Sequence, residues 1–527
     1  MPSDIGDIKI EKNPWVILFL LLIPILGLLV NGYRYGVSDQ ALYIPMIDRA
    51  VNPELFPNDY LFDEPSGEYN FWIPAMSILA RFFSLEWIFF VGYVLTRFGL
   101  FWAIYHLSLN LFDSRGAAVL AVLFLITPKS VGGTATATQD TFFTLRSTAM
   151  PFAIAFLIPY FRGRLIPAAI ICGVAFLIHP ITAIPLVGLL ALRLLIDGFR
   201  DDWRTPAKAF GIFLICVLPL FVRVFLINHA NPSDLSLLSR SHPQWLEIIK
   251  RRDSYIFLSV WNRDAFQSVI VNLTILLAIL LFRRWYSRRT AVPNNGFIRE
   301  KDRWAFGVIL VCLGLFIIGG VFVEWYPLPL VVQLQVLRSL YLLVNLSQIY
   351  LAWMLIDRIG GVLVKLASFL TKRKIRQIAT GGLIAVILAM IVPNLAKLRE
   401  GPAMSHVNLP GALPRSDWID VGLWCQANTP IDAVFFVPIH VLGFRIHSRR
   451  SSVGNWKDGA PCVFSEHYAK KWWARMEELK GYNSFDEGRF NQLKEKYGAS
   501  FAVTRKGQRL RFPILYENNG FVVYALN

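Results

Sequence analysis

Long apolar runs separated by short polar segments dominate the chain up to residue 395. About 20 apolar residues are enough for a helix to cross a bilayer. About eleven runs approach that length. They are 14–32, 86–111, 116–130, 147–161, 165–180, 182–197, 208–227, 266–283, 305–323, 336–356 and 377–395. The pattern predicts a polytopic α-helical membrane protein with about eleven transmembrane helices.

One apolar segment does not fit a crossing helix. Residues 71–84 contain Pro74 and Arg81, which favour a helix lying in the membrane interface. Pro180, by contrast, divides a longer apolar stretch into two separate spans.

The short loops predict the orientation of the chain. With a cytoplasmic N-terminus, the strongly basic short loops near residues 115, 162–164, 200–208, 283–303 and 358–376 all lie on one side. The positive-inside rule then selects an odd number of spans and an extracytoplasmic C-terminus. The loops 33–70, 131–146 and 228–265, and the chain after about residue 396, are expected outside the cytoplasm.

The C-terminal part of the chain has a different pattern. A helix-like segment, 418–428, precedes a strand-like run, 433–438. Two polar helices, 466–480 and 485–497, and two strand-like runs, 499–504 and 521–526, follow. We therefore predict a transmembrane domain over 1–398 and a small extracytoplasmic α/β domain over 399–527.

Composition narrows the class of protein. The chain is 55% hydrophobic and 17% charged, which excludes a soluble globular protein. Its net charge of +17 is explained by basic cytoplasmic loops, so no nucleic-acid partner is expected. There is no Walker motif, GxSxG, HExxH or dinucleotide fingerprint, which argues against ATP-driven transport and the familiar hydrolases. The first apolar run lacks a cleavage site and is expected to remain as an anchor.

Asp39 is the leading candidate for chemistry. It lies in the tripeptide Ser38-Asp39-Gln40, shortly beyond the first span, at the start of the loop 33–70. A carboxylate at the membrane surface is costly unless it binds something or reacts. It could accept a proton from an incoming hydroxyl as a general base. The alternatives are a solvated loop residue or an N-cap for the helix expected from Ala41.

Further candidate substrate-binding residues lie near the outer ends of the spans or in the C-terminal domain. They are Gln40, Asp59, Asp140, Arg146, His179, Arg240, His242, Arg338, Arg445, Arg449 and Arg450. A buried Arg338 would need a carboxylate or phosphate partner, and outer cations suit an anionic headgroup. Solvated loops, a snorkelling Arg146 and a satisfied core His179 remain alternatives.

Three smaller features are left open by the sequence. Asp59, with Asp63 and Glu64, forms an acidic turn that could hold a divalent cation or sugar hydroxyls, or could simply be hydrophilic. The basic cluster FRIHSRRSSVGNWK, which ends at Lys457, could bind phosphate or an acidic glycan. Cys425 and Cys462 lie in the outer compartment, where a disulfide could form, and no cysteine spacing indicates a metal site.

These features together resemble the GT-C superfamily of integral-membrane glycosyltransferases, which use polyprenyl-phosphate-linked sugars. The resemblance includes the acidic first outer loop with SDQ...YxPxI...NPELFPND, the interfacial helix and the terminal outer domain. That domain carries the motif W-x3-NTP-x-DAVFFVP, which runs from Trp424 to Pro438.

The resemblance implies a catalytic base at Asp39 and a donor phosphate held by basic residues such as Arg338. The sugar would pass to a glycan, lipid or protein acceptor on the extracytoplasmic side of a bacterial inner membrane, in polysaccharide biosynthesis for the cell envelope. Asp39 is followed by Gln40 without a DxD or ExD pair, a departure from the family pattern that argues against a required metal. No cofactor is certain, and a divalent metal is left as an open alternative.

Two other functions remain open. O-antigen ligases and polysaccharide polymerases also have many spans and basic outer residues, but they usually centre on one large loop between late spans. A lipid-linked glycan transporter or flippase is expected to show charged or broken helices at mid-membrane in two related halves. The large outer domain here is terminal, and no internal symmetry is visible in the sequence.

Overall fold

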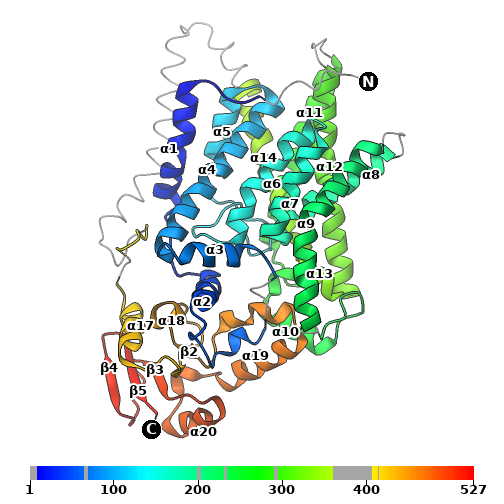
Figure 1. Ribbon diagram of the computed structural model, residues 1–527. Helices are drawn as coiled ribbons and strands as arrows, with labels where there is room; N and C mark the ends of the chain where they lie inside the picture. Colours follow the sequence, from blue (N-terminus) through cyan, green and yellow to red (C-terminus); the bar gives the residue numbers. More distant parts are fainter. Residues whose placement is uncertain are drawn as a thin grey trace.

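The computed structural model describes residues 9–64, 69–198, 203–230, 234–289, 295–359, 406–412 and 415–526. They form a helical bundle with a smaller domain at one end (Figure 1). The bundle helices are α1 (Pro14–Asn31), α4 (Leu85–Phe112), α5 (Arg115–Leu125), α6 (Leu145–Phe161), α7 (Leu165–Ile178), α8 (Pro180–Gly198), α9 (Arg204–Ala230), α11 (Arg263–Arg289), α12 (Asn295–Gly319), α13 (Pro329–Leu334) and α14 (Tyr341–Trp353).

These helices coincide with the predicted spans up to 336–356. Seven described helices are long and apolar enough to cross a membrane, and α5, α6 and α7 are shorter apolar helices. The boundary between α7 and α8 falls at Pro180, as predicted, because proline cannot donate the backbone hydrogen bond that a continuous helix needs. The predicted span 377–395 lies outside the described residues, so the count of eleven is not confirmed.

Two short helices lie across the bundle rather than along it. They are α2 (Gln40–Val51) and α3 (Trp72–Ala80), which pack near the lower end of the bundle (Figure 1). Ile78, Leu79 and Phe82 at the end of α3 are exposed apolar side chains. The position of α3 matches the interfacial helix predicted for 71–84, since such side chains suit the boundary between headgroups and acyl chains.

Polar contacts identify the end of the bundle that carries the basic loops. Glu11 accepts hydrogen bonds from Tyr105 at 2.6 Å and from Arg115 at 2.9 Å. Ser114 donates to Asp357 at 3.0 Å, so the segment η7 (Met354–Ile359), which follows α14, lies at the same end of the bundle.

The residues at 406–412 lie at the opposite end of the bundle. The Tyr33 amide donates to the carbonyl of His406 at 3.1 Å, and the Asn408 amide donates to the carbonyl of Tyr33 at 2.8 Å. Gly32 permits this approach: its φ is +76°, and an added Cβ would lie 2.3 Å from the His406 oxygen. Asp357 and His406 therefore lie at opposite ends of the bundle.

The C-terminal domain is built on one mixed five-stranded sheet with the order β2-β1-β3-β5-β4. The strands are β1 (Val434–Phe436), β2 (Ser451–Ser452), β3 (Phe501–Arg505), β4 (Ile514–Glu517) and β5 (Phe521–Ala525). β1 pairs in parallel with β2 and β3, whereas β5 is antiparallel to β3 and β4. The helices are α17 (Asp417–Asn428), α18 (Phe444–Ser448), α19 (Glu466–Glu478) and α20 (Glu487–Tyr497).

The predicted helices and all three predicted strands of this domain are present. β2 and β4 had no sequence signal, because β2 has two residues and β4 has no clear alternation of buried and exposed positions. Cys425 and Cys462 are both buried and free, so the disulfide considered from the sequence is wrong.

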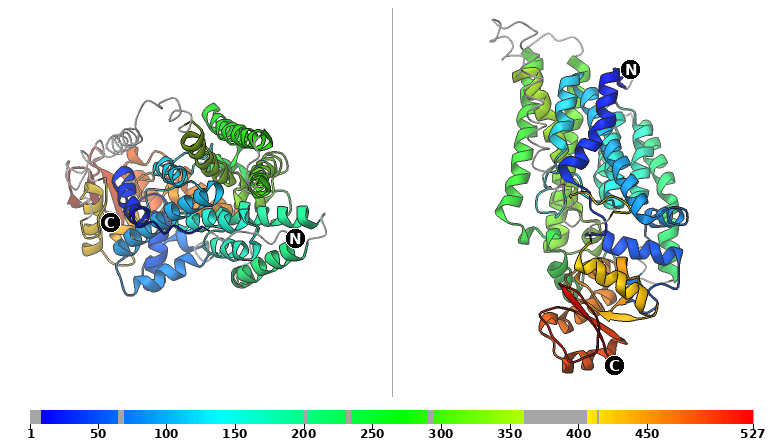
Figure 2. Two further views of the ribbon diagram at one scale, coloured as in Figure 1. Left: turned by 90° about the horizontal axis from the view of Figure 1, so that it is seen from above. Right: turned by 90° about the vertical axis from the view of Figure 1, so that its left-hand side faces the viewer.

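The outer domain and the loops of the bundle share one hydrophobic core. Trp245 of α10 (Pro243–Arg252) is fully buried among residues of α19, and its indole nitrogen donates to the carbonyl of Cys462 at 2.9 Å. Tyr60, from the first loop, lies in the same cluster and stacks on Tyr468. The right-hand view in Figure 2 shows the domain at the end of the bundle opposite the N-terminus.

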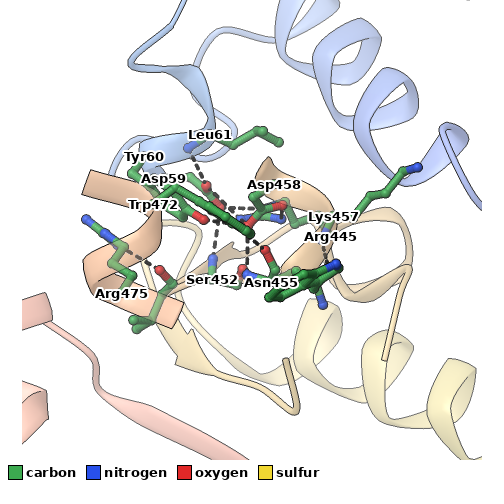
Figure 3. Close-up of polar contacts among 12 residues, drawn as sticks. Asp59, Tyr60, Leu61, Arg445, Ser452, Asn455, Lys457, Asp458, Trp472 and Arg475 are labelled. Carbon is green, nitrogen blue, oxygen red and sulfur yellow. Dashed lines mark hydrogen bonds and ion pairs between the residues drawn. The ribbon is translucent and has the colours of Figure 1, made fainter. Parts of the chain in front are cut away.

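A buried ionic cluster, which we call the Arg445 clamp, joins the first loop to the outer domain (Figure 3). Arg445 donates to Asp59 at 2.6 and 2.9 Å and to Asp458 at 2.8 and 2.9 Å. The three side chains are 6%, 0% and 1% exposed. The Ser452 amide donates to Asp59 at 2.9 Å, and the Tyr60 hydroxyl donates to Asp458 at 3.1 Å. The two carboxylates are therefore well supplied with donors despite their burial.

Replacing Arg445 should separate the domain from the loop. Arg445→Met leaves two buried carboxylates without their cation, a change that costs about 3–5 kcal/mol. We expect a large fall in the midpoint of thermal unfolding of the purified protein. Arg509→Met is the matched control: its pair with Glu517 is exposed and screened by solvent, so its loss should change the midpoint little. Equal midpoints for the two variants would show that the clamp is not needed.

The sidedness of the membrane stays a prediction, and cysteine labelling tests it. Glu495 is exposed on the outer domain and Arg289 is exposed at the basic end of α11. In intact cells, a membrane-impermeant maleimide should label Glu495→Cys, whereas Arg289→Cys should react only after permeabilisation, because basic loops remain cytoplasmic. The unsubstituted protein gives the background, and the reverse pattern would overturn the orientation.

Candidate functional site

A cavity of about 1530 Å³ lies between one end of the bundle and the outer domain. Its walls come from the start of α2, the loop before α6, the α7–α8 junction, α9, the segment after α10, the break between α13 and α14, and the outer domain. Of the predicted residues, the cavity brings together Asp39, Asp140, Arg146, His179 and Arg338. Segments far apart in the sequence thus meet at one site.

Asp39 faces this cavity rather than capping α2. Ser38 has a φ of +53°, a left-handed turn directly before the carboxylate. Asp39 is the N-cap residue of α2, but its side chain makes no capping hydrogen bond. It accepts instead from the ammonium group of Lys457 at 2.5 Å and is 34% exposed. Asp39 therefore occupies the N-cap position, but its side chain does not cap the helix.

Neighbouring cations control the charge of Asp39. Burial by itself would raise the pKa of the carboxyl group, but Lys457, Arg146 and Arg338 together lower it to about 2. Asp39 is thus a carboxylate over the whole physiological range, and while Lys457 is paired with it, it is a weak base.

The charge of Arg146, in the first turn of α6, is balanced by Asp140 from the loop before that helix. Its guanidinium donates two hydrogen bonds to Asp140, at 2.5 and 3.0 Å, in a bidentate pair whose side chains are 15% and 8% exposed. Thr144 holds the start of α6 with a capping box, which fixes the position of Arg146 in the first turn. Arg146 therefore does not snorkel freely.

Arg338 has no acidic partner among the described residues. It lies in η6 (Val336–Leu340), a 3₁₀ turn after Gln335, whose φ of +46° breaks the helix between α13 and α14. Its guanidinium lies 4.9 Å from the centre of the Tyr255 ring. Arg338 Nε and Gln335 Oε1 are both buried without a hydrogen-bond partner within the described ranges. A carboxylate and a phosphate were the two partners expected for Arg338, and no described carboxylate pairs with it.

The cavity is also lined by residues that the sequence did not single out. Lys457 belonged to the basic cluster noted in the sequence, but nothing marked it as the member that reaches Asp39. Arg252 pairs with Asp253 at 2.9 Å and donates to the carbonyl of Trp456 at 3.1 Å. Tyr43 and Tyr255 also line the cavity and had no sequence signal, because a tyrosine by itself does not indicate a binding site.

Several predicted binding residues have a different environment. Gln40 is fully buried, accepts from the Gly36 amide at 2.7 Å and donates to the carbonyl of Phe143 at 3.0 Å. Arg240 and His242 are exposed outside the cavity, and His242 lies 3.4 Å from Glu466. These three residues are left out of the candidate site.

The clamp and its neighbours are likewise separate from the cavity. Asp59 and Arg445 use their polar atoms on each other and on nearby donors and acceptors, so neither is available to a ligand. Arg450 donates to the carbonyls of Gln426 and Thr429, each at 2.7 Å. Arg449 is half exposed and lies 3.3 Å from Asp48. The sequence could not show that these arginines have structural partners, because a buried structural arginine and a ligand-binding arginine have the same residue type.

One wall of the cavity is apolar and borders the outer surface of the bundle. Phe221 and Val224 of α9 line the cavity, and Phe221 is 54% exposed. Leu218, Phe225 and Leu226 continue this exposed apolar face along α9. In a bilayer, an acyl or prenyl chain would cover such a surface, so the cavity borders the region that lipid occupies.

The described residues contain no group of three or more His, Cys, Asp or Glu side chains arranged to hold a metal ion.

His179, at the α7–α8 junction, lines the cavity. One of its ring nitrogens shares a hydrogen bond of 2.8 Å with the Thr182 hydroxyl.

A family model described as a domain of unknown function (DUF6798) matches residues 416–479. This stretch runs from α17 to the end of α19 and includes Arg445, Lys457 and Asp458. A search of curated proteins gave no match.

Among solved structures, the chain is similar to two crystal structures of ArnT from Cupriavidus metallidurans. The first, bound to undecaprenyl phosphate, has 15% identity and a TM-score of 0.48, and the match covers 98% of this chain and 99% of that chain. The second, in the apo state, has 15% identity and a TM-score of 0.46, with 97% and 98% covered. The likeness is distant, and the function proposed next rests on this chain's own residues.

Proposed function

We propose that the protein is a membrane glycosyltransferase that moves a sugar from a polyprenyl-phosphate donor to an extracytoplasmic acceptor. The observation that carries this proposal is a carboxylate, Asp39, facing a cavity that has an apolar wall towards the lipid. The same cavity holds a guanidinium, Arg338, that has no acidic partner among the described residues. A lipid-phosphate sugar has the matching parts: an apolar tail, an anionic group and a polar sugar.

The charges lining the cavity support a phosphate ligand. Arg146 and Arg252 are each paired with their own aspartate, and Lys457 is paired with Asp39. Arg338 remains without an acidic partner among the described residues, and a phosphate would supply one. Its planar guanidinium can bind two phosphate oxygens at once.

The reaction is a displacement at the anomeric carbon. An acceptor hydroxyl oxygen forms the new bond to this carbon while its proton passes to the Asp39 carboxylate. The bond between the anomeric carbon and the phosphate oxygen breaks, and the polyprenyl phosphate leaves with the electron pair. Arg338 and Lys457 stabilise the negative charge that develops on the leaving phosphate.

Lys457 also decides when Asp39 can act as a base. While the two side chains are paired, the carboxylate is too weak a base to draw a proton from a hydroxyl. A donor phosphate offers Lys457 a second, more highly charged partner. When Lys457 moves to the phosphate, burial again raises the pKa of Asp39, so the base is strengthened only with the donor in place.

The location of the cavity favours an enzyme over a flippase. Its lining comes from one end of the bundle and from the outer domain, whereas moving a headgroup across the membrane needs a polar path through the middle. A ligase or polymerase that uses a lipid-linked glycan would share the same donor chemistry and would differ in the acceptor.

Asp39 and Arg338 should affect different steps. Asp39→Asn should reduce kcat for sugar transfer by at least about 10²-fold, because a positioned base contributes about 10²–10⁴-fold. It should still bind donor. Arg338→Met should mainly weaken binding of a polyprenyl-phosphate sugar, with partial rescue by Arg338→Lys. Transfer kinetics and donor binding would be measured in reconstituted vesicles.

Asp63→Asn is the matched control for this experiment, because Asp63 pairs with Lys471 outside the cavity. It should transfer sugar at the rate of the unsubstituted protein. Undiminished turnover in Asp39→Asn would reject the assignment of the base.

The pH dependence of kcat/KM tests the role of Lys457. In the free enzyme the pKa of Asp39 is about 2, so the rate should be insensitive to Asp39 protonation from pH 7 down to about 4. Removing the cation in Lys457→Gln should raise this pKa by about 1–3 units, so that activity falls on acidification within a measurable range. Lys457→Arg should restore the original profile. An unchanged acid limb in Lys457→Gln would contradict the proposed coupling.

A further inference from the structure

A second pocket, of about 510 Å³, lies on the outer domain beside α10 and is separate from the reaction cavity. Its walls come from residues 438–441, from η9 (Trp456–Val463), from α19 and from the turn around η10 (Tyr482–Ser484). Its size is within the range of about 300–1,000 Å³ that is typical of ligand pockets. We refer to it as the Trp456 groove.

Half-buried aromatic side chains form the walls of the Trp456 groove. Trp456 and Trp473 both line it and are neither fully buried nor fully exposed. Trp456 packs between His440, at 5.8 Å between ring centres, and the buried Trp472, at 5.1 Å. Arg251 lies over the Trp473 ring at 5.0 Å. The two indoles are therefore fixed in place and present apolar surface to a ligand.

Charged side chains form the rim of the groove. Glu477, Lys480 and Arg505 line it with exposed side chains that have no hydrogen-bond or ionic partner in the part of the chain that the structure describes. They provide acceptors and donors around an aromatic surface. A pyranose has the complementary form, with C–H groups on its faces that can stack on an indole and hydroxyls around its edge that can bond to these side chains.

The groove is adjacent to the reaction cavity through the start of η9. Trp456 lines the groove, and the next residue, Lys457, lines the cavity and pairs with Asp39. Arg252 fixes this turn by donating to the carbonyls of Trp456, at 3.1 Å, and Lys457, at 3.3 Å. A ligand in the groove therefore lies one residue from the group that controls the base.

From this geometry we infer that the Trp456 groove binds an oligosaccharide. Its role as the site of a glycan acceptor chain rests on the proposed transferase function, whereas the binding itself does not. This assignment selects a glycan over a lipid or a protein as the acceptor class.

Binding can be tested on the purified full-length protein without any donor. The probes are maltohexaose, cellohexaose, chitohexaose and an oligogalacturonate, each measured by saturation-transfer difference NMR at millimolar concentration. At least one should bind, and Trp473→Ala should weaken it by about tenfold through loss of an aromatic surface. Glu477→Ala, which changes no packing contact, should weaken the same probe by a smaller factor.

Trp424→Ala is the matched control, since Trp424 is a half-buried tryptophan of the same domain that stacks on Tyr516 outside the groove. It should bind like the unsubstituted protein. Failure of all four probes to bind, or equal binding by Trp473→Ala, would overturn the inference. Asp39→Asn should bind normally. If that variant also keeps transferase activity, the proposed base is wrong while the glycan site stands.

Discussion

The arrangement of this protein depends on the buried ion cluster around Arg445. It brings together Asp59, from the first loop after α1, and Asp458, from the outer domain, residues that are 399 positions apart in the chain. An isolated buried charge is very costly, so the cluster is stable only when both segments are docked and every donor is in place. This requirement makes the docking of the outer domain specific as well as favourable.

The reaction cavity follows from that docking. Lys457 precedes Asp458 directly, so the clamp that holds Asp458 also holds Lys457 near Asp39. The outer domain thus contributes a cation to a site whose other groups come from the bundle. The same η9 segment presents Trp456 to the second groove. One docked turn therefore links the anchoring of the domain, the charge of the proposed base and a surface suited to a glycan.

The electrostatics of the cavity explain why a strongly basic chain has a site of modest charge. Its cations are mostly paired one to one with carboxylates, as in Arg146 with Asp140 and Arg252 with Asp253. Arg338 is the exception among the described lining residues. A guanidinium without an ionic partner among the described residues, placed beside an apolar wall, is the group that we propose binds an anionic lipid headgroup.

The sequence alone determined the membrane class, the helices up to 336–356, the short helix in 71–84 and most elements of the outer domain. These follow from local hydrophobic periods and helix breakers such as Pro180. It also identified Asp39 and Arg338, since charges at span ends are costly. Only the tertiary structure decided which carboxylate each cation contacts. Arg445 and Lys457 lie 12 positions apart in one basic cluster, yet one is enclosed in the clamp and the other faces the cavity. Their residue types do not distinguish them, because burial and long-range pairing are set by contacts with segments about 400 residues away.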